Sequence, residues 1–282
     1  MKRVWAGLAV VLCLLLILLI WSAWIEPRRL VVREATLALE KLESAHPGLR
    51  VAVLADLHIG SPHHGLAKLR AIVAAVNERE PDLVVILGDL VTQGVLGGSV
   101  VAPERIAPLL AELDAPLGTF AVLGNHDYWY GAALVAASLR SAGVTVLEDE
   151  GDYVTAGGQR IWLAGVTDYW EGRHDIAGAL ASVPENEPSI LLTHNPDVFP
   201  EVPERVDLTL AGHTHGGQVN LPVLGRLIVP SRFGQRYAAG LVAEGGKQLF
   251  VSTGTGTSIL PIRFRVPPEV VMLNLQPADR RN

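Results

Sequence analysis

Short runs of apolar residues recur along the chain, each about five residues long, which is the usual length of a β-strand. The clearest runs are residues 51–55, 83–87, 119–123, 189–193 and 208–211. They do not alternate with polar residues, a pattern typical of a strand that is covered on both faces. Between the first two runs, residues 66–80 carry apolar side chains at the spacing of a helix with one buried face. This alternation of strands and helices predicts an α/β fold.

The rest of the pattern extends the prediction toward a second sheet. Additional helices are predicted at residues 103–113, 132–142 and 175–181, and additional strands at residues 144–147, 153–156, 160–164, 248–252 and 270–275. Glycine turns join the short strands in the middle of the chain. Residues 30–42 fit either a strand or a short helix.

An uncharged apolar segment precedes all of these elements. Residues 4–25 contain no charged side chain and are long enough, at about 22 residues, to span the hydrocarbon core of a bilayer. Trp5, Trp21 and Trp24 lie near its ends, where aromatic side chains anchor spans at the membrane interface. A cleaved signal peptide is the alternative, but the run is longer than a signal core and no Ala-x-Ala site follows it. The pattern therefore favours a retained, single-pass anchor.

The charges around this segment do not fix its orientation. Basic residues flank both ends, namely Lys2, Arg3, Arg28, Arg29 and Arg33. The positive-inside rule is therefore nearly balanced, and the side of the membrane stays open. We expect an anchor over residues 1–29 and one folded domain over residues 30–282.

Composition narrows the function classes. The formal net charge is −6 at pH 7 and the isoelectric point is about 5.8, which argues against a nucleic-acid-binding face, because such faces need clustered Lys and Arg. The only cysteine, Cys13, lies within the apolar segment, so no disulfide within the chain is possible.

Polar side chains follow the apolar runs where the predicted strands end. They are Asp56, His58, Asp89, Asn125, His126, Asp127, His194, His213 and His215. The carboxyl ends of strands are where open α/β sheets build their sites. One such residue alone would most simply be a helix cap or a solvated side chain, but the recurrence favours a common site. Glycines around His213 and His215 let the turn aim both rings at one region, as metal ligands require.

This series of residues resembles the calcineurin-like metallophosphoesterase signature. Its five blocks are, in order, Asp56-x-His58, Gly88-Asp89, Gly124-Asn125-His126-Asp127, His194 and Gly212-His213-x-His215. All five lie between residues 51 and 217 and no ligand is missing. The one small departure is Ala55, where Ser is common, and that residue is not a ligand.

Further segments resemble the bacterial membrane-anchored phosphodiesterase branch of that superfamily, which is related to UDP-diacylglucosamine pyrophosphatases. They are the leading apolar helix, Gly216-Gly217-Gln218, residues 258–263 and Pro268-Glu269. The resemblance implies a four-layer α/β/β/α sandwich of two mixed sheets, preceded by one transmembrane helix. It also implies location in a bacterial inner membrane.

The resemblance implies a site with two divalent metal ions. It assigns one ion to Asp56, His58, Asp89 and His215, and the other to Asp89, Asn125, His194 and His213. Imidazole and carboxylate ligands together suit Mn²⁺, which we favour, or Fe²⁺ or Zn²⁺. Two cations about 3.5–4 Å apart can hold a hydroxide nucleophile and clamp phosphate oxygens. His126 is then the expected general acid for the leaving oxygen, oriented or kept charged by Asp127.

The expected reaction is hydrolysis of a phosphodiester or pyrophosphate bond. An anchored domain works beside a bilayer, so a lipid-linked substrate such as UDP-diacylglucosamine, a precursor of lipid A, is expected. Tyr128, Trp129 and His63 are candidate substrate contacts, although packing under the following helix explains the aromatic pair equally well. The polar, aromatic loop at residues 167–174 is a further candidate for a pocket wall.

Two other functions stay open. The first is a broad phosphodiesterase or phosphomonoesterase that acts on small or cell-wall phosphoesters. The second is an inactive, metal-binding membrane scaffold, which is disfavoured because a pseudoenzyme is expected to have lost a ligand or His126. No nucleic-acid partner is expected, and the sequence does not set the oligomeric state.

Overall fold

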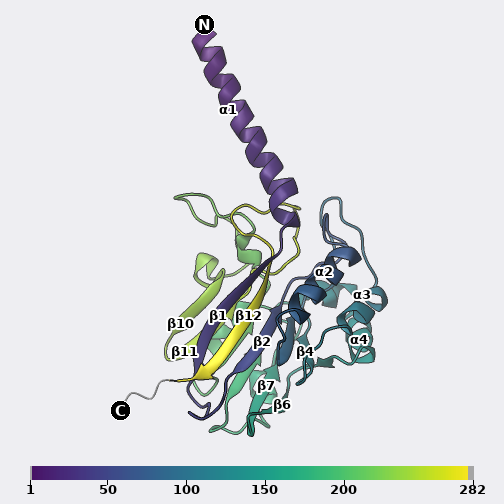
Figure 1. Cartoon of the computed structure of the whole chain (residues 1–282), viewed down its shortest axis with the longest axis vertical. Helices are drawn as coiled ribbons and strands as arrows, with labels where there is room; N and C mark the ends of the chain where they lie inside the picture. Colours follow the sequence, from purple (N-terminus) through teal and green to yellow (C-terminus); the bar gives the residue numbers. More distant parts are fainter. Residues whose placement is uncertain (1, 279–282) are drawn as a thin grey trace.

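An apolar helix stands clear of an α/β domain in the computed structural model, which describes residues 2–278 (Figure 1). The helix α1 (Lys2–Ile20) continues into a π-helical turn, η1 (Trp21–Ile25), and a 3-10 turn, η2 (Glu26–Arg28). No residue of α1 is buried in the described part of the structure. By length and composition, the stretch Lys2–Arg28 could cross a membrane.

Two six-stranded sheets form the centre of the domain. The first has the order β1-β12-β2-β3-β4-β5, with bounds β1 (Val31–Leu39), β2 (Leu49–Leu54), β3 (Leu83–Leu87), β4 (Thr119–Val122), β5 (Thr145–Val146) and β12 (Glu269–Pro277). The second has the order β10-β11-β9-β8-β7-β6, with bounds β6 (Glu150–Ala156), β7 (Gln159–Gly165), β8 (Ser189–Leu192), β9 (Leu208–Ala211), β10 (Gly240–Glu244) and β11 (Lys247–Val251). Each sheet contains parallel and antiparallel pairs, so the predicted pair of mixed sheets is confirmed.

Both faces of the central strands are buried, which explains their continuous apolar runs. In β2, Val51 and Val53 face the second sheet and belong to the core between the sheets. Ala52 and Leu54 face the other way and belong to the core under the helices. Because successive side chains of a strand point to opposite faces, a strand covered on both faces needs apolar residues at every position.

Helices cover the two outer faces. The first sheet is covered by α2 (Leu66–Asn77), α3 (Pro103–Leu110) and α4 (Asn125–Ser141). The outer face of the second sheet is covered by shorter pieces, namely α5 (Ile176–Ala179) and the 3-10 turns η3 (Pro196–Glu201) and η5 (Gly234–Tyr237). The outer layer on this side is therefore thinner than the layer on the other.

Two elements differ from the sequence pattern, and one alternative that the pattern left open is settled. The helix predicted at residues 132–142 begins at Asn125 instead, because Gly124 caps it and Gly131, with φ of 139°, interrupts its apolar period. The ambiguous segment 30–42 contains strand β1, which pairs with β12. Strand β10 was not predicted, since it lies at a sheet edge and its side chains are only partly covered.

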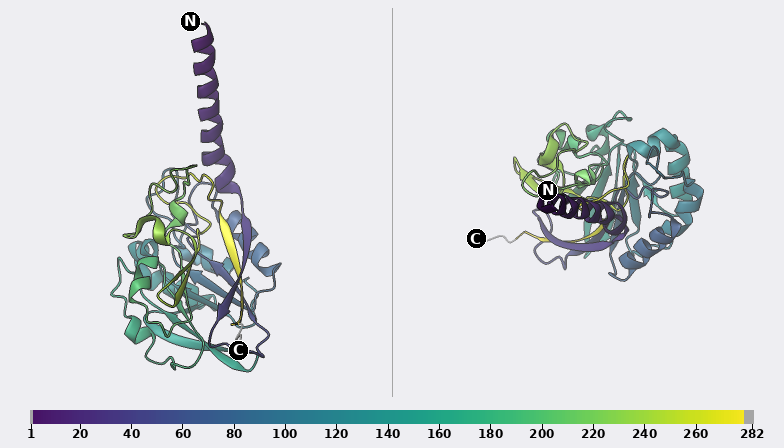
Figure 2. Two further views of the ribbon diagram at one scale, coloured as in Figure 1. Left: turned by 90° about the vertical axis from the view of Figure 1, so that its left-hand side faces the viewer. Right: turned by 90° about the horizontal axis from the view of Figure 1, so that it is seen from above.

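The strand directions bring the base of α1 and the predicted site to one end of the sheets. Strand β1 starts just after the helix base and runs parallel to β12, which is antiparallel to β2. The carboxyl end of β2 therefore lies at the end where α1 joins the domain, and the parallel strands β3 and β4 end there too. Figure 2 shows α1 leaving the domain at one end.

Removing a side chain from the core between the sheets should be costly. Leu163 in β7 is fully buried there, and we expect Leu163→Ala to lower the free energy of unfolding by about 2–5 kcal/mol, because a cavity remains. Leu134→Ala is the control, since Leu134 is 46% exposed on α4 and its loss should change stability by less than about 0.5 kcal/mol. Urea unfolding of the full chain in detergent measures both. Equal urea midpoints for the two variants would contradict the burial of Leu163 in the core between the sheets.

Candidate metal centre

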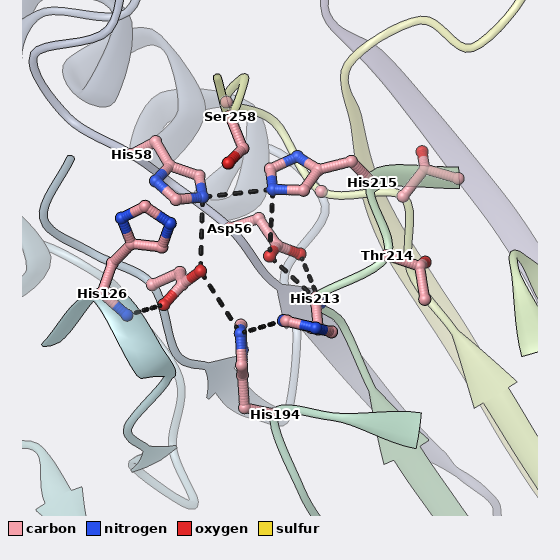
Figure 3. Close-up of polar contacts among 12 residues, drawn as sticks. Asp56, His58, His126, His194, His213, Thr214, His215 and Ser258 are labelled. Carbon is pink, nitrogen blue, oxygen red and sulfur yellow. Dashed lines mark hydrogen bonds and ion pairs between the residues drawn. The ribbon is translucent and has the colours of Figure 1, made fainter. Parts of the chain in front are cut away.

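The loops after β2, β3, β8 and β9 bring six potential ligands to one point (Figure 3). The potential ligand atoms form two groups, Asp56, His58, Asp89 and His215 in one and Asp89, His194 and His213 in the other, and within each group they lie within 4.8 Å of one another. All of these side chains are buried. Asn125 at the start of α4 joins the second group, because its Oδ1 lies 3.2 Å from His194 Nε2.

Asp89 is shared by the two groups. Its Oδ2 lies 3.4 Å from His58 Nε2 on one side and 3.3 Å from His194 Nε2 on the other. Its Oδ1 accepts a hydrogen bond of 2.9 Å from the backbone N–H of His126. One carboxylate thus faces both ligand groups while its second oxygen is held by the backbone of α4.

The donor atoms fit divalent cations. Ring nitrogens face each other at 3.1 Å in the pairs His58–His215 and His194–His213, with carboxylate oxygens beside them. Nδ1 of His194 lies 2.7 Å from the carbonyl oxygen of Leu87, which can only accept, so Nδ1 carries a proton and Nε2 is the nitrogen that would bind a cation. Such a convergence of nitrogen and oxygen donors, without sulfur, suits Mn²⁺, Fe²⁺ or Zn²⁺.

The backbone is strained at the predicted ligands. Asp56, His58, Asp89, His213 and His215 all have positive φ, between 39° and 69°. This left-handed region is uncommon for residues other than glycine, and each instance costs of order 1–3 kcal/mol. The sharp turns after the strands are what point these side chains at a common centre, and a bound cation would offset their cost.

The electrostatics of the cluster centre on Asp89 and His194. Burial favours the neutral carboxyl, but the nearby His194 and His58 outweigh it and hold the pKa of Asp89 well below its usual range. Burial favours the neutral imidazole of His194 as well, but Asp89 outweighs it and raises the pKa of His194 to about 10. Burial lowers the pKa of His213 to about 3 and raises that of Asp56 to about 6. Cation binding at His194 should therefore release a proton.

His126 lies beside this cluster and lines the floor of a cavity. Its ring packs edge-on to His58 with centroids 4.7 Å apart and contacts Trp129 with centroids 4.5 Å apart. Burial, together with the charges of His58 and His194, outweighs the effect of Asp89 and lowers the pKa of His126 to about 4. The imidazole is therefore neutral near pH 7, and an anionic phosphoryl group beside it would oppose this shift.

The expectation that Asp127 orients His126 is wrong. The buried Asp127 carboxylate accepts backbone N–H groups from Leu90 at 2.9 Å, Val91 at 3.2 Å and Gly124 at 3.1 Å. Adjacent residues of a helix do not face each other, so Asp127 points into the domain while His126 points to the cavity. Asp127 instead ties the start of α4 to the segment after β3 that carries Asp89.

The cavity has a volume of about 580 Å³ and opens over the ligands. Its floor contains Asp89, Asn125, His126, His213 and His215. Its outer wall is apolar and comes from the segments 219–230 and 259–262. This size and this combination of a polar floor and an apolar wall are typical of small-molecule sites.

The three candidate substrate contacts lie in different places. Trp129 lines the cavity and is half-exposed. Tyr128 packs against the core under the helices and is not among the cavity-lining residues. His63 lies at the base of α1, where its Nδ1 accepts a hydrogen bond of 3.1 Å from Arg28 Nε. From the loop 167–174, Trp170 lines the cavity and contacts the ring of His213, with centroids 4.3 Å apart.

Sequence reasoning missed the role of Arg263. This side chain is fully buried and donates to the carbonyl oxygens of Thr253 at 2.8 Å and Gly256 at 2.6 Å. A Cβ added at Gly256 would lie 2.6 Å from His58 Cβ, so the segment held by Arg263 packs directly behind a ligand. The available signal was one arginine between the apolar residues Ile262 and Phe264.

Comparisons with known proteins agree with this geometry. A family profile described as calcineurin-like phosphoesterase matches residues 49–217. Uncharacterized metallophosphoesterase YkuE of Bacillus subtilis is 31% identical over 259 residues, which cover 91% of this chain and 89% of that protein. Phosphodiesterase YaeI of Escherichia coli is 35% identical over 230 residues, 80% of this chain and 82% of that protein. A Danio rerio transmembrane protein with metallophosphoesterase domain is 32% identical over 271 residues, 90% of this chain and 58% of that protein.

Replacing Gly124 by Ala should weaken metal binding. The added Cβ would lie 2.3 Å from Asp89 Oδ1, which forces the shared carboxylate to move. The φ of Gly124 is −103°, so this contact and not backbone strain is the cause. We expect the variant to bind Mn²⁺ with about 10–100-fold lower affinity than the wild type. Isothermal titration calorimetry of the full chain in detergent measures this affinity.

Gly65→Ala is the matched control for this substitution. Gly65 also precedes a helix, and nothing lies within 4 Å of its added Cβ. Wild-type affinity is expected for this variant. Unchanged affinity in Gly124→Ala would show that Asp89 does not hold the metal ions.

Proposed function

This chain belongs to the calcineurin-like phosphoesterase family and is a metal-dependent phosphoester hydrolase, and we propose that it is a membrane-anchored phosphodiesterase with two metal ions. We propose that it hydrolyses a phosphodiester or pyrophosphate bond in a lipid-linked substrate such as UDP-diacylglucosamine. The observation that carries this proposal is the position of Asp89, which faces both ligand groups at the floor of the cavity. A shared carboxylate is what a two-metal phosphoesterase needs.

The proposed ligand sets follow the two groups. Asp56, His58, Asp89 and His215 would hold one ion, and Asp89, Asn125, His194 and His213 the other, with Mn²⁺ as the favoured metal. When bound, two divalent cations supply charge neutralisation at the phosphoryl oxygens and acidity to water. Two carboxylates against two divalent cations leave the site net positive, and the neutral Asn125 preserves that charge, which suits an anionic transition state.

We propose that His126 donates the proton that the leaving oxygen needs. Its ring borders the cavity beside the ligands, and its Nδ1 has no hydrogen-bond partner within residues 2–278. The ring is positioned by contacts with His58 and Trp129, a role that was expected for Asp127. A phosphoryl anion in the cavity would favour the protonated imidazole by its charge.

The lipid-linked character of the substrate is supported by the apolar wall of the cavity, which continues outward from the polar floor. The proposed anchor, residues 1–29, is supported by the apolar helix and by the relative that is named a transmembrane protein. The proposed catalytic domain comprises residues 30–282, and the proposed location of the anchor is a bacterial inner membrane. An acyl chain along the apolar wall would leave the phosphoryl group at the ligands.

The full chain in detergent, stripped of metal and resupplied with Mn²⁺, tests this function. We expect metal-dependent hydrolysis of UDP-diacylglucosamine to exceed that of bis-p-nitrophenyl phosphate, and Asp89→Asn to abolish both. Hydrolysis of the generic diester alone would replace the lipid substrate by a small or cell-wall phosphoester. No hydrolysis of either substrate with metal bound would leave an inactive scaffold.

The role of His126 predicts a dependence on the leaving group. His126→Ala should lower kcat by about 10²–10⁴-fold for an alkyl phosphodiester, whose leaving alkoxide must be protonated. The loss should be at least about tenfold smaller for bis-p-nitrophenyl phosphate, because nitrophenolate leaves without a proton. Steady-state kinetics with both substrates measures this difference, and equal losses would contradict the assignment of His126 as an acid.

A further inference from the structure

Exposed apolar side chains gather on the outer wall of the cavity and on the loops beside it. Leu227, Ile228 and Ile259 line the outer wall and are 65%, 80% and 72% exposed. Leu96, Val223 and Leu224 are 68%, 105% and 61% exposed. We call these six residues the apolar rim. Exposed apolar residues gathered around a site mark contact with another molecule or with a membrane.

The loops that carry the rim are hydrogen-bonded to one another and to the base of α1. Leu96 N–H donates to the carbonyl oxygen of Ile259 at 2.9 Å, which joins the first and last of these loops. Asn220 N–H donates to Phe264 at 2.9 Å, and Arg263 N–H donates to Ser22 in η1 at 2.8 Å. The rim loops and the helix base therefore form one continuous surface at the same end of the domain (Figures 1 and 2).

Buried polar contacts fix the direction in which the helix leaves this surface. Glu26 is almost fully buried and accepts hydrogen bonds from Trp21 Nε1 at 2.6 Å and from the backbone N–H of Val266 at 2.7 Å. Arg28 stacks on Trp24, with its guanidinium 3.7 Å from the ring centroid. A buried carboxylate with two donors holds the base of α1 to the domain, so a membrane that contains α1 would lie at the same end of the domain as the rim.

The turn at residues 221–225 has unusual chemistry for a water-facing tip. Its apex is Pro222-Val223-Leu224, and Val223 has φ of 69°, which is a strained conformation for a β-branched residue. The hairpin turns at the other end of the sheets use Gly157-Gly158 and Gly245-Gly246. Glycine is the usual residue at positive φ in a water-exposed turn. The strained, apolar apex beside the helix base is therefore better suited to contact with lipid than with water.

We propose that the apolar rim inserts into the bilayer interface and forms the passage by which a lipid-linked substrate reaches the metal centre. The acyl part of the substrate stays in the bilayer and moves along Leu227, Ile228 and Ile259, while the phosphoryl group enters the polar floor. This inference rests on the proposed anchor and on the proposed lipid-linked substrate. It adds a second membrane contact, made by the catalytic domain itself.

Depth-dependent quenching of a fluorescent label tests the rim directly. The full chain is placed in nanodiscs of phosphatidylethanolamine and phosphatidylglycerol, with and without nitroxide-labelled lipid, and carries one environment-sensitive label. Cys13, the native cysteine of α1, carries it in the first sample. In a Cys13→Ser background, Leu96→Cys, Val223→Cys and the control Tyr153→Cys carry it in the others. Tyr153 is 46% exposed on β6.

We expect lipid nitroxides to quench the labels at positions 13, 96 and 223 by at least about twofold, and the label at position 153 not at all. Quenching at position 13 without quenching at positions 96 and 223 would overturn the rim contact and leave the anchor intact. No quenching at position 13 would instead refute the proposed anchor. Labels at positions 96 and 223 that are shielded from water but not quenched by lipid would show that a second copy of the chain covers the rim.

Activity gives an independent readout of the same surface. The double variant Val223→Asp, Leu224→Asp should lower turnover of UDP-diacylglucosamine in nanodiscs about tenfold relative to turnover of soluble bis-p-nitrophenyl phosphate. The control Leu134→Asp places the same charge on another exposed apolar residue, Leu134 on α4 (46% exposed), and should leave that ratio unchanged. An unchanged ratio in the double variant would contradict the passage, and the soluble diester reports whether the variant is folded.

Discussion

The Asp89 carboxylate is the constraint on which the rest of the site depends. One of its oxygens faces imidazoles of both ligand groups, and the other is held by the first turn of α4. This arrangement needs β3 to end in a left-handed turn, and it needs glycine at position 124, where any Cβ would strike the carboxylate. Asp127 completes the arrangement from behind by holding the same loop through three backbone N–H groups. The apolar strands supply the rigid frame that keeps these strained turns in place.

The base of α1 and the candidate metal centre are joined by a chain of polar contacts. Arg263 bonds through its backbone to the base of α1 and through its side chain to the segment that backs His58. Glu26 accepts a hydrogen bond from the backbone N–H of Val266, three residues after Arg263. Because these contacts are buried, the position of the helix and the opening of the cavity are set together. This coupling is a consequence of the topology, in which the ligand-bearing strand ends and the base of α1 share one end of the sheets.

The sequence predicted most of the frame, because buried strands need continuous apolar runs and because ligands follow those runs. It placed Asp56, Asp89 and the histidines at strand ends that the fold does bring together. It failed where the role of a side chain depends on the direction in which the fold points it. Neighbouring positions 126 and 127 look like a pair in sequence, yet helix geometry points them apart. The apolar wall and the contacts of Arg263 come from segments after residue 218, whose irregular backbone carries no periodic signal.

Electron paramagnetic resonance of the full-length, Mn²⁺-loaded protein, combined with metal counting, measures the sharing of Asp89 most directly. A carboxylate between two ions predicts two Mn²⁺ per chain and a spin-coupled spectrum, which Asp89→Asn converts to that of isolated ions. One Mn²⁺ per chain in the wild type, or two ions without spin coupling, would contradict a dinuclear centre built on Asp89.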